Sequence, residues 1–103
     1  MTTYAVFIRD VTTNPAELEV YGRKSQAGTE GHPLTRLAVY GAFEVLEGPP
    51  IEGAVILQFP SMDDAKSWYN SPLYQDALQH RLAGAKYRAF FIEGLTEITL
   101  KGA

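Results

Sequence analysis

The sequence predicts a single α+β domain in which strands and helices follow one another in the order β-α-β-β-α-β. Three observations lead to this prediction. Four runs are rich in aromatic and β-branched residues, which is typical of strands. Two stretches begin with a capping side chain that is followed three residues later by a carboxylate, which is typical of a helix start. The chain shows no internal repeat, linker or low-complexity stretch that would divide it.

The first strand is predicted over Tyr4–Arg9, which reads YAVFIR. A helix should begin at Asn14–Glu17, because Asn14 can cap it, proline suits the first helical position and Glu17 completes a capping box. We expect this helix to run to about Gly28 or Gly31. Its apolar stripe is thin, so the helix should lie across the sheet with one side in water; the stripe consists of Leu18, Tyr21 and Ala27.

The middle of the chain predicts two further strands that are joined by a turn. The first is Leu37–Leu46, in which Gly41 is expected to form a bulge because glycine in a strand often marks one. Glu47–Pro50 reads as the turn, since it carries glycine and two prolines. The next strand is Ala54–Phe59, an apolar run that reads AVILQF.

The second helical region should be broken into two helices. Ser61 caps the first of them, with Asp64 as the carboxylate of the capping box. Asn70-Ser71-Pro72 then starts a fresh helix, because Ser71 can cap it and Pro72 suits its first position. This second helix should reach about Gly84, and the bend between the two lets the chain follow a curved sheet.

The last strand is predicted over Tyr87–Glu93. We therefore expect one domain over residues 1–95 and a C-terminal tail over 96–103, in which Glu97–Leu100 is weakly strand-like. The complete order predicts a ferredoxin-like fold, with a four-stranded antiparallel sheet and helices on one face.

Both faces of this sheet are predicted to be apolar. The first strand places Tyr4, Val6 and Ile8 on one face and Ala5 and Phe7 on the other, whereas a sheet with one wet face should alternate with polar residues. Burying one large apolar side chain stabilises by roughly 1.5–3 kcal/mol, so exposing six or more would exceed a typical stability margin of about 5–15 kcal/mol. We therefore predict a homodimer through this sheet face.

Composition excludes several classes of function. The net charge is −3 and the nine lysines and arginines are scattered, which argues against a nucleic-acid partner. The chain has no cysteine, so disulfides, thiolate metal sites and cysteine nucleophiles are excluded. The apolar runs are far shorter than the roughly 20 residues that span a membrane, and no signal peptide is recognisable, so a cytoplasmic location is predicted.

The stretch Phe59–Gly94 resembles the DUF1330 family. The shared motifs are a strand that ends in Phe-Pro, a helix with Trp-Tyr, a Ser-Pro-x-Tyr break, an arginine in the next helix and a closing strand that ends in Glu-Gly. Glu44–Gly48 is similar to the ending of the family's second strand. The resemblance extends over residues 4 to 94 and weakens between Gly28 and Tyr40, where Pro33 and Leu34 stand near positions at which the family tends to have glycines.

The resemblance implies a small dimeric α+β barrel, with an arginine of the family at the position of Arg81. Related barrel superfamilies include cofactor-free monooxygenases, haem-degrading enzymes, dehydratases and ligand-binding modules. A shared fold does not choose among these functions.

The pair His80-Arg81 is the sharpest candidate for chemistry. Histidine can act as a general base near neutral pH, and arginine can hold a carboxylate or enolate in a bidentate fork. Adjacent helical residues point about 100° apart, so both cannot face one pocket squarely, and the spacing from Leu73 and Ala77 directs Arg81 towards the apolar face. The alternative is structural: Arg81 pairs with a carboxylate such as Glu44 or Glu93.

Four more residues complete the predicted site. Glu44 lies within the apolar second strand. If it faces a dry interior, burial would raise the pKa of its carboxyl group and make it an acid or base. If it faces the rim of the sheet, it would merely be solvated. Tyr40 and Tyr74 are expected to offer hydroxyl groups to a ligand, and Trp68 either lines the cleft or packs helix on sheet. His32, in a Gly-His-Pro loop, is expected to be solvated.

We therefore predict an apolar cleft that binds a small organic acid or aromatic molecule, with Arg81 as the anion anchor, Glu44 or His80 as the base and Tyr74 as a donor. The protein would then act as a cofactor-independent enzyme. A non-catalytic dimeric module and a cofactor-free monooxygenase stay open as alternatives. No metal site or cofactor is expected, because two isolated histidines lack ligand spacing.

Overall fold

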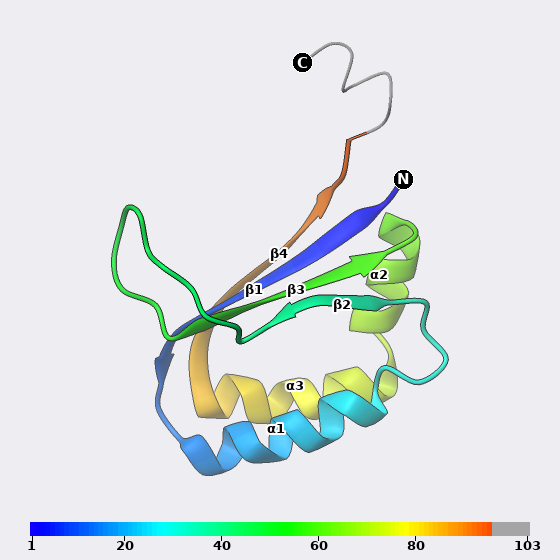
Figure 1. Ribbon diagram of the computed structural model, residues 1–103. Coiled ribbons are helices and arrows are strands. Elements are labelled where there is room, and N and C mark those ends of the chain that lie inside the picture. Colours follow the sequence, from blue (N-terminus) through cyan, green and yellow to red (C-terminus); the bar gives the residue numbers. More distant parts are fainter. Residues whose placement is uncertain (96–103) are drawn as a thin grey trace.

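The computed structural model describes residues 1–95 of the chain and contains four strands and three helices (Figure 1). In chain order these are β1 (Thr3–Thr12), α1 (Pro15–Ala27), β2 (Thr35–Val39), β3 (Gly53–Phe59), α2 (Met62–Tyr69), α3 (Pro72–Gly84) and β4 (Ala85–Glu93). The predicted order and the break in the second helical region are both confirmed. The tail and its strand-like run, Glu97–Leu100, lie outside the described residues.

The four strands form one antiparallel sheet in the order β2-β3-β1-β4. This is the order of the predicted ferredoxin-like fold. The two central strands are fully paired, so that Phe7 of β1 lies between Val55 of β3 and Ala89 of β4. A bulge after Arg9 shifts the pairing of β1 with β4.

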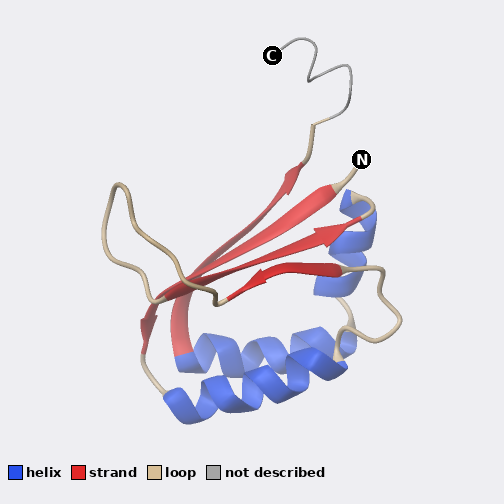
Figure 2. Cartoon of the chain, in the orientation of Figure 1, coloured by secondary structure: helices blue, strands red, loops and turns tan. Residues whose placement is uncertain are grey.

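All three helices lie on one face of the sheet, as Figure 2 shows. The core forms between them, because alternate residues of the central strands point towards the helices. Its members are Ala5, Phe7, Leu57, Phe59, Ala65, Trp68, Tyr74 and Leu78. Trp68 is the centre of an aromatic cluster, with ring centroids 5.4 Å from Phe59 and 4.2 Å from Tyr74.

All three helices begin at the predicted residues, but only two of the three predicted side-chain caps form. The Ser61 hydroxyl accepts the Asp64 amide at 3.0 Å, and the Ser71 hydroxyl accepts the Tyr74 amide at 3.3 Å. The capping box predicted at Asn14 is wrong, because its side chain makes no cap hydrogen bond. Instead the Asn14 amide donates to the carbonyl oxygen of Gly84 at 2.9 Å, so the start of α1 is anchored on the end of α3.

The second strand is much shorter than the prediction of Leu37–Leu46. It ends at Val39 because Tyr40 adopts a φ of 50°, which turns the chain away from the ladder. The bulge also falls elsewhere, between Arg36 and Ala38 rather than at Gly41. Residues 41–52 form a loop that extends beyond the sheet (Figure 1), so Glu44 lies in a loop instead of a strand, and its side chain is exposed, as in the solvated alternative.

The face of the sheet opposite the helices is apolar and uncovered by the described residues. It carries the alternate set of strand side chains, and at the β4 edge Phe90 and Ile92 are 50% and 53% exposed. Val6 and Ile56 pair across the centre of this face and are half-buried. The prediction of two apolar sheet faces is therefore confirmed.

Among residues 1–95, no helix combines the length and the apolar character needed to cross a membrane. The cytoplasmic location stays a prediction.

Candidate functional site

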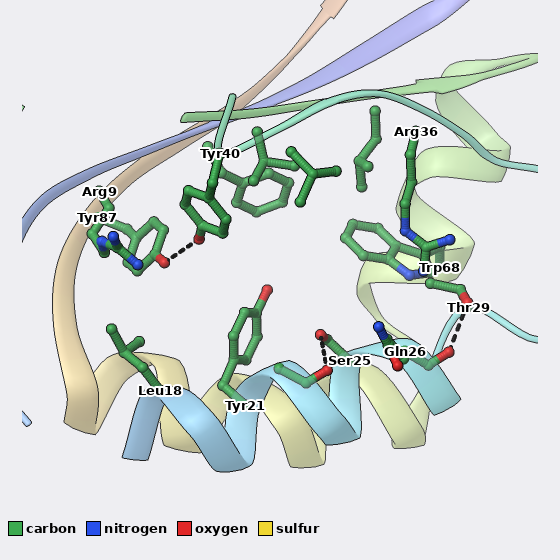
Figure 3. A pocket seen from close by; sticks show the side chains of 15 residues that line it. Arg9, Leu18, Tyr21, Ser25, Gln26, Thr29, Arg36, Tyr40, Trp68 and Tyr87 are labelled. Carbon is green, nitrogen blue, oxygen red and sulfur yellow. Dashed lines mark hydrogen bonds between the residues drawn. The ribbon is translucent and has the colours of Figure 1, made fainter. Parts of the chain in front are cut away.

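A cavity of about 230 Å³ lies between α1 and the sheet (Figure 3). It is larger than the roughly 150 Å³ that holds one benzene molecule and smaller than the cavities of about 300–1,000 Å³ that hold drug-sized ligands. Its walls are mostly apolar and come from all four strands, from α1 and α2, and from the residues just after α1 and β2. The lining residues are Phe7, Arg9, Leu18, Tyr21, Gly22, Ser25, Gln26, Thr29, Arg36, Val39, Tyr40, Val55, Leu57, Trp68 and Tyr87.

The cavity exists because α1 does not seal against the sheet. None of its residues is buried, as the thin apolar stripe predicted. The helix is held instead by α3. The amides of Thr13 and Asn14, just before α1, both donate hydrogen bonds to the carbonyl oxygen of Gly84 at the end of α3, at 2.8 and 2.9 Å. A side chain on Gly84 would lie 3.0 Å from Leu18, so glycine allows the two helices to approach closely.

Tyr21 is the residue of α1 that points into the cavity, with its hydroxyl group at the centre of the view in Figure 3. This hydroxyl is 2.9 Å from the hydroxyl of Tyr74, which lies on α3 and is fully buried. Burial, together with the neighbouring Tyr74, raises the pKa of Tyr21 far above that of a free tyrosine. Burial also raises the pKa of Tyr74, although the hydroxyl of Tyr21 and the charge of Arg81 oppose this. Both side chains are therefore neutral hydrogen-bonding groups at physiological pH.

A second pair of tyrosines closes the other end of the cavity. The hydroxyl groups of Tyr40 and Tyr87 are hydrogen-bonded to each other (Figure 3). The Tyr40 ring packs on the Cα of Gly53, where an added Cβ would meet it at 2.7 Å, and the Arg9 guanidinium lies 4.7 Å from its centroid. Burial and the bond to Tyr87 raise the pKa of Tyr40, so this group is neutral as well.

Arg81 lies behind the cavity wall and is 4% exposed. Its guanidinium carbon is 4.9 Å from the centroid of Tyr87, 5.4 Å from that of Phe7 and 5.9 Å from that of Tyr21. Its Nε is buried without a hydrogen-bond partner, and no carboxylate within residues 1–95 forms an ion pair with it. The predicted inward direction of Arg81 is confirmed, while the alternative of a pair with Glu44 or Glu93 is wrong for the described chain.

Two further arginines line the cavity itself. Arg9 lies 3.3 Å from the exposed carboxylate of Glu52, measured from Nε to Oε1. Arg36 lies at the Trp68 end of the cavity (Figure 3), and the described part of the chain places no carboxylate in an ion pair with it. Trp68 has a buried Nε1 that finds no acceptor among the described residues. The cavity is thus lined by cations and hydrogen-bond donors, and no lining residue is a carboxylate or a histidine.

The structure brings only part of the predicted site together. Tyr40 and Trp68 line the cavity, and Tyr74 touches it only through Tyr21. His80 does not line it: its Nδ1 lies 2.5 Å from Oε2 of Glu17, in a pair that joins α3 to α1.

Two other residues lie apart from the cavity. Glu44 is exposed in the loop after β2, as described above, and His32 is half-buried in the loop after α1 and is not among the lining residues. Residues 1–95 contain no group of three or more histidine, cysteine or carboxylate side chains that could hold a metal ion.

Several cavity residues were not predicted from the sequence. The most important are Tyr21, Arg9, Arg36 and Tyr87. One signal for Tyr21 was present, because it belongs to an apolar stripe too thin to cover a sheet. Arg9 and Tyr87 pair across β1 and β4 and point to the helix side, as the alternation of side chains from Phe7 and Ala89 would have indicated.

Comparison with solved structures shows the same fold in several proteins. The RPA0582 protein of unknown function from Rhodopseudomonas palustris is 23% identical, with a TM-score of 0.71 over 92% of this chain and 83% of that one. A dimeric ferredoxin-like protein of unknown function from Thermobifida fusca YX is 14% identical, with a TM-score of 0.63 over 91% and 92%. SnoaB, a cofactor-independent oxygenase from Streptomyces nogalater, is 13% identical, with a TM-score of 0.53 over 94% of both chains.

No curated protein matches the sequence. These structural relatives are all less than 25% identical, so the likeness to them shows the fold alone. The sequence itself matches the family described as "Domain of unknown function (DUF1330)" over residues 2–95. That match covers nearly the whole chain, and the protein therefore belongs to the DUF1330 family.

Proposed function

We propose that this protein is a homodimer that binds a small organic anion, such as an aromatic acid, in the cavity between α1 and the sheet. The observation that carries the proposal is the buried Arg81 directly behind the cavity wall. Moving a guanidinium group from water into the protein interior costs several kcal/mol of free energy unless a negative charge compensates it. Because the described chain supplies no carboxylate, an anion in the cavity is the natural source of that charge.

The shape and lining of the cavity support the same ligand class. Its volume of about 230 Å³ suits a molecule of one or two rings. Phe7, Leu57 and Trp68 offer apolar surface to a ring, while the hydroxyl of Tyr21 and the guanidinium groups of Arg9 and Arg36 offer donors to its polar group. A largely apolar pocket with a few convergent polar groups is the usual form of a small-molecule site.

The lining also limits the chemistry that the protein would perform on a bound molecule. The lining residues include no histidine or carboxylate that could act as a general base, so His80 and Glu44 are no longer proposed in that role. Neutral donors and cations instead stabilise negative charge that the ligand already carries. Arg81 keeps its proposed function as the source of positive charge, acting from behind the wall rather than as a bidentate fork on the ligand.

A second candidate function follows from this lining. A cofactor-free oxygenase uses a substrate whose own anion reacts with oxygen, so that the protein needs to bind and stabilise that anion. The same fold in SnoaB supports this possibility by analogy only. If the protein only binds the ligand and catalyses no reaction, the cavity alone is sufficient for its function.

The uncovered apolar sheet face supports the homodimer. Exposing Phe90, Ile92 and their neighbours to water is costly, and an identical face of a second copy would bury them. The relative from Thermobifida fusca is described as dimeric and has the same fold. Light scattering at micromolar concentration should therefore give twice the chain mass of 11.4 kDa, and a mass near 11.4 kDa would refute the dimer.

Ligand binding is tested by titrating the protein with benzoate and with benzyl alcohol, which has the same ring but no charge. Trp68 is the single tryptophan, so its fluorescence reports the cavity directly. We expect benzoate to bind more tightly than benzyl alcohol, and R36Q to weaken benzoate binding about twofold to fivefold.

The variant R23Q is the matched control, because Arg23 is exposed on α1 and does not line the cavity. Equal binding of the two probes would contradict the preference for an anion. No binding of either probe would refute the ligand-binding function and favour a structural role for the dimer. Oxygen consumption in the presence of a bound phenolic compound would distinguish the oxygenase from a module.

A further inference from the structure

Three residues form a continuous polar path from the core to the cavity. Arg81 and Tyr74 both lie on α3 and are buried, whereas Tyr21 lies on α1 and its hydroxyl group faces the cavity (Figure 3). The hydroxyl groups of Tyr74 and Tyr21 are 2.9 Å apart. Arg81 follows Tyr74 by seven residues, two turns further along the same side of α3, and its positive charge lowers the pKa of the Tyr74 hydroxyl group.

The inner part of this path is shielded from water, since Arg81 is 4% and Tyr74 0% exposed. Aromatic rings of Phe7, Tyr21 and Tyr87 surround the Arg81 guanidinium, and the Trp68 ring packs 4.2 Å from that of Tyr74. In such a low-dielectric site a positive charge polarises neighbouring hydrogen bonds more strongly than in water, and successive bonds strengthen one another. The Tyr21 hydroxyl is the only end of this path that a ligand in the cavity can reach without entering the core.

We propose that Arg81 acts through Tyr74 to make the Tyr21 hydroxyl a polarised donor, so that the cavity selects a ligand with an anionic oxygen, phenolate, enolate or carboxylate, at Tyr21. This inference rests on the proposed function, and it adds the group that contacts the anion and the residues that position and polarise it. Tyr21 touches the ligand, while Tyr74 and Arg81 are positioning residues that act through it.

Either hydroxyl group can donate in the bond between Tyr21 and Tyr74, and the proposal requires that Tyr74 donates when a ligand is bound. A guanidinium can only donate, so it does not compete for the proton of Tyr74, which can then go to the oxygen of Tyr21. Tyr21 then has its own proton free for the ligand. Arg81, Tyr74 and Tyr21 then donate in sequence towards the cavity. This arrangement favours a ligand oxygen that carries negative charge and disfavours a ligand group that can only donate a hydrogen bond. The high pKa values of Tyr21 and Tyr74 keep both protons in place at physiological pH.

The test uses 4-nitrophenol, whose ionised form absorbs visible light and whose neutral form does not. Affinity is measured by calorimetry, and ionisation of the bound probe is measured by absorbance as the pH is varied. A donor to a charged oxygen should favour the bound phenolate over the bound phenol about tenfold to a hundredfold. The bound probe should then ionise about one to two pH units below the free probe.

The variants assign this effect to the path. Y21F should abolish the shift in ionisation, and Y74F should reduce it because the link to the charge is broken. R81K should retain most of the shift since the charge remains, whereas R81M should lose it. Should R81M fail to fold, Y74F decides the same point with the loss of one oxygen atom.

Y69F is the matched control. Tyr69 belongs to the same aromatic cluster, with its ring 5.3 Å from that of Tyr74, but it does not line the cavity. It should leave the ionisation of the bound probe unchanged.

The outcomes separate this inference from the proposed function. If 4-nitrophenol and its uncharged analogue 4-nitrotoluene both fail to bind, the cavity is not a ligand site and both proposals are overturned. If both bind equally and the bound phenol ionises at the pH of the free probe, the cavity is a ligand site but the inference is wrong. A shift that survives in Y21F would also overturn it, because the donor would be another group.

Discussion

Replacing Gly84 by alanine tests whether the contact between α1 and α3 holds the wall of the cavity in place. Gly84 ends α3, and a Cβ there would lie 3.0 Å from the backbone nitrogen of Leu18 and from two of its side-chain carbons. Such a contact is too short to be relieved by a side-chain rotation alone, because one of the atoms is backbone. Overpacking of this kind costs about 1–3 kcal/mol of the free energy of unfolding.

The opposing term is the higher helix propensity of alanine, which is worth about 1 kcal/mol in a helix interior and less at a helix end. Gly22 on α1 provides the control, since a Cβ there meets no atom within 4 Å. G22A should therefore stabilise by about 0.5–1 kcal/mol through backbone entropy alone. We expect G84A to be less stable than G22A by about 1–3 kcal/mol, with the overpacking term dominating the difference.

The assay is urea unfolding of the wild type and both variants at one protein concentration, because a dimer's stability depends on concentration. G84A should also weaken benzoate binding, since Leu18 and Tyr21 line the cavity and would move with α1. The reasoning is refuted if G84A is as stable as G22A. It is also refuted if G84A is destabilised but binds benzoate like the wild type, because α1 would then not be positioned by this contact.

Three further predictions follow from the sheet face, the tyrosines and the histidine. F90E should give a mass near 11.4 kDa in light scattering, because a charge would replace a ring worth roughly 1.5–3 kcal/mol in each half of the interface; an unchanged mass would place the interface elsewhere. The folded state raises the pKa of three tyrosines, Tyr21, Tyr40 and Tyr74. Above the ordinary tyrosine pKa of about 10, these residues ionise first in the unfolded chain, so the free energy of unfolding should be retained below that pH and fall as the pH rises above it. Tyrosinate absorbance and circular dichroism recorded together check this, and ionisation of these residues before loss of the fold would contradict it. H80Q should lower stability by less than about 1 kcal/mol, as expected for a partly exposed pair of polar side chains, and should leave benzoate affinity unchanged; a large loss of affinity would restore His80 to the site.

The fold could be predicted well because each signal it depends on is local. Ser61 and Ser71 cap their helices as predicted, and Pro72 begins α3 where the sequence breaks the helical pattern. The strand order of the sheet then follows from the element order, since few arrangements of β-α-β-β-α-β are compact. The Asn14 capping box did not form because its partners are engaged in tertiary contacts: the Asn14 amide, which Glu17 would have accepted, donates to the carbonyl oxygen of Gly84, and Glu17 pairs with His80 instead.

The site could be predicted only in part because it depends on which strand residues face α1. The helical periodicity directed Arg81 inward, but it could not show that Arg81 would meet aromatic rings instead of a carboxylate. Arg9 and Arg36 reach the cavity through the strand register, including a bulge at residues 36–38 that no sequence signal marks. Tyr21 was visible as a stripe residue, but the function proposed for it depends on the hydroxyl group of Tyr74, which only the structure places beside it.

The largest error in the predicted fold coincides with the cavity, and the two have one cause. An apolar run such as Leu37–Leu46 should continue as a strand, yet it stops where Tyr40 takes a positive φ, a conformation that is uncommon for a bulky residue. That turn folds the Tyr40 ring back over β3, where only a glycine at position 53 leaves room for it. The ring then hydrogen-bonds to Tyr87 and receives the Arg9 guanidinium on its face, which closes one end of the cavity. Local preference for a strand is overridden at the place where the candidate site forms, and conflicts of this kind are expected at functional positions.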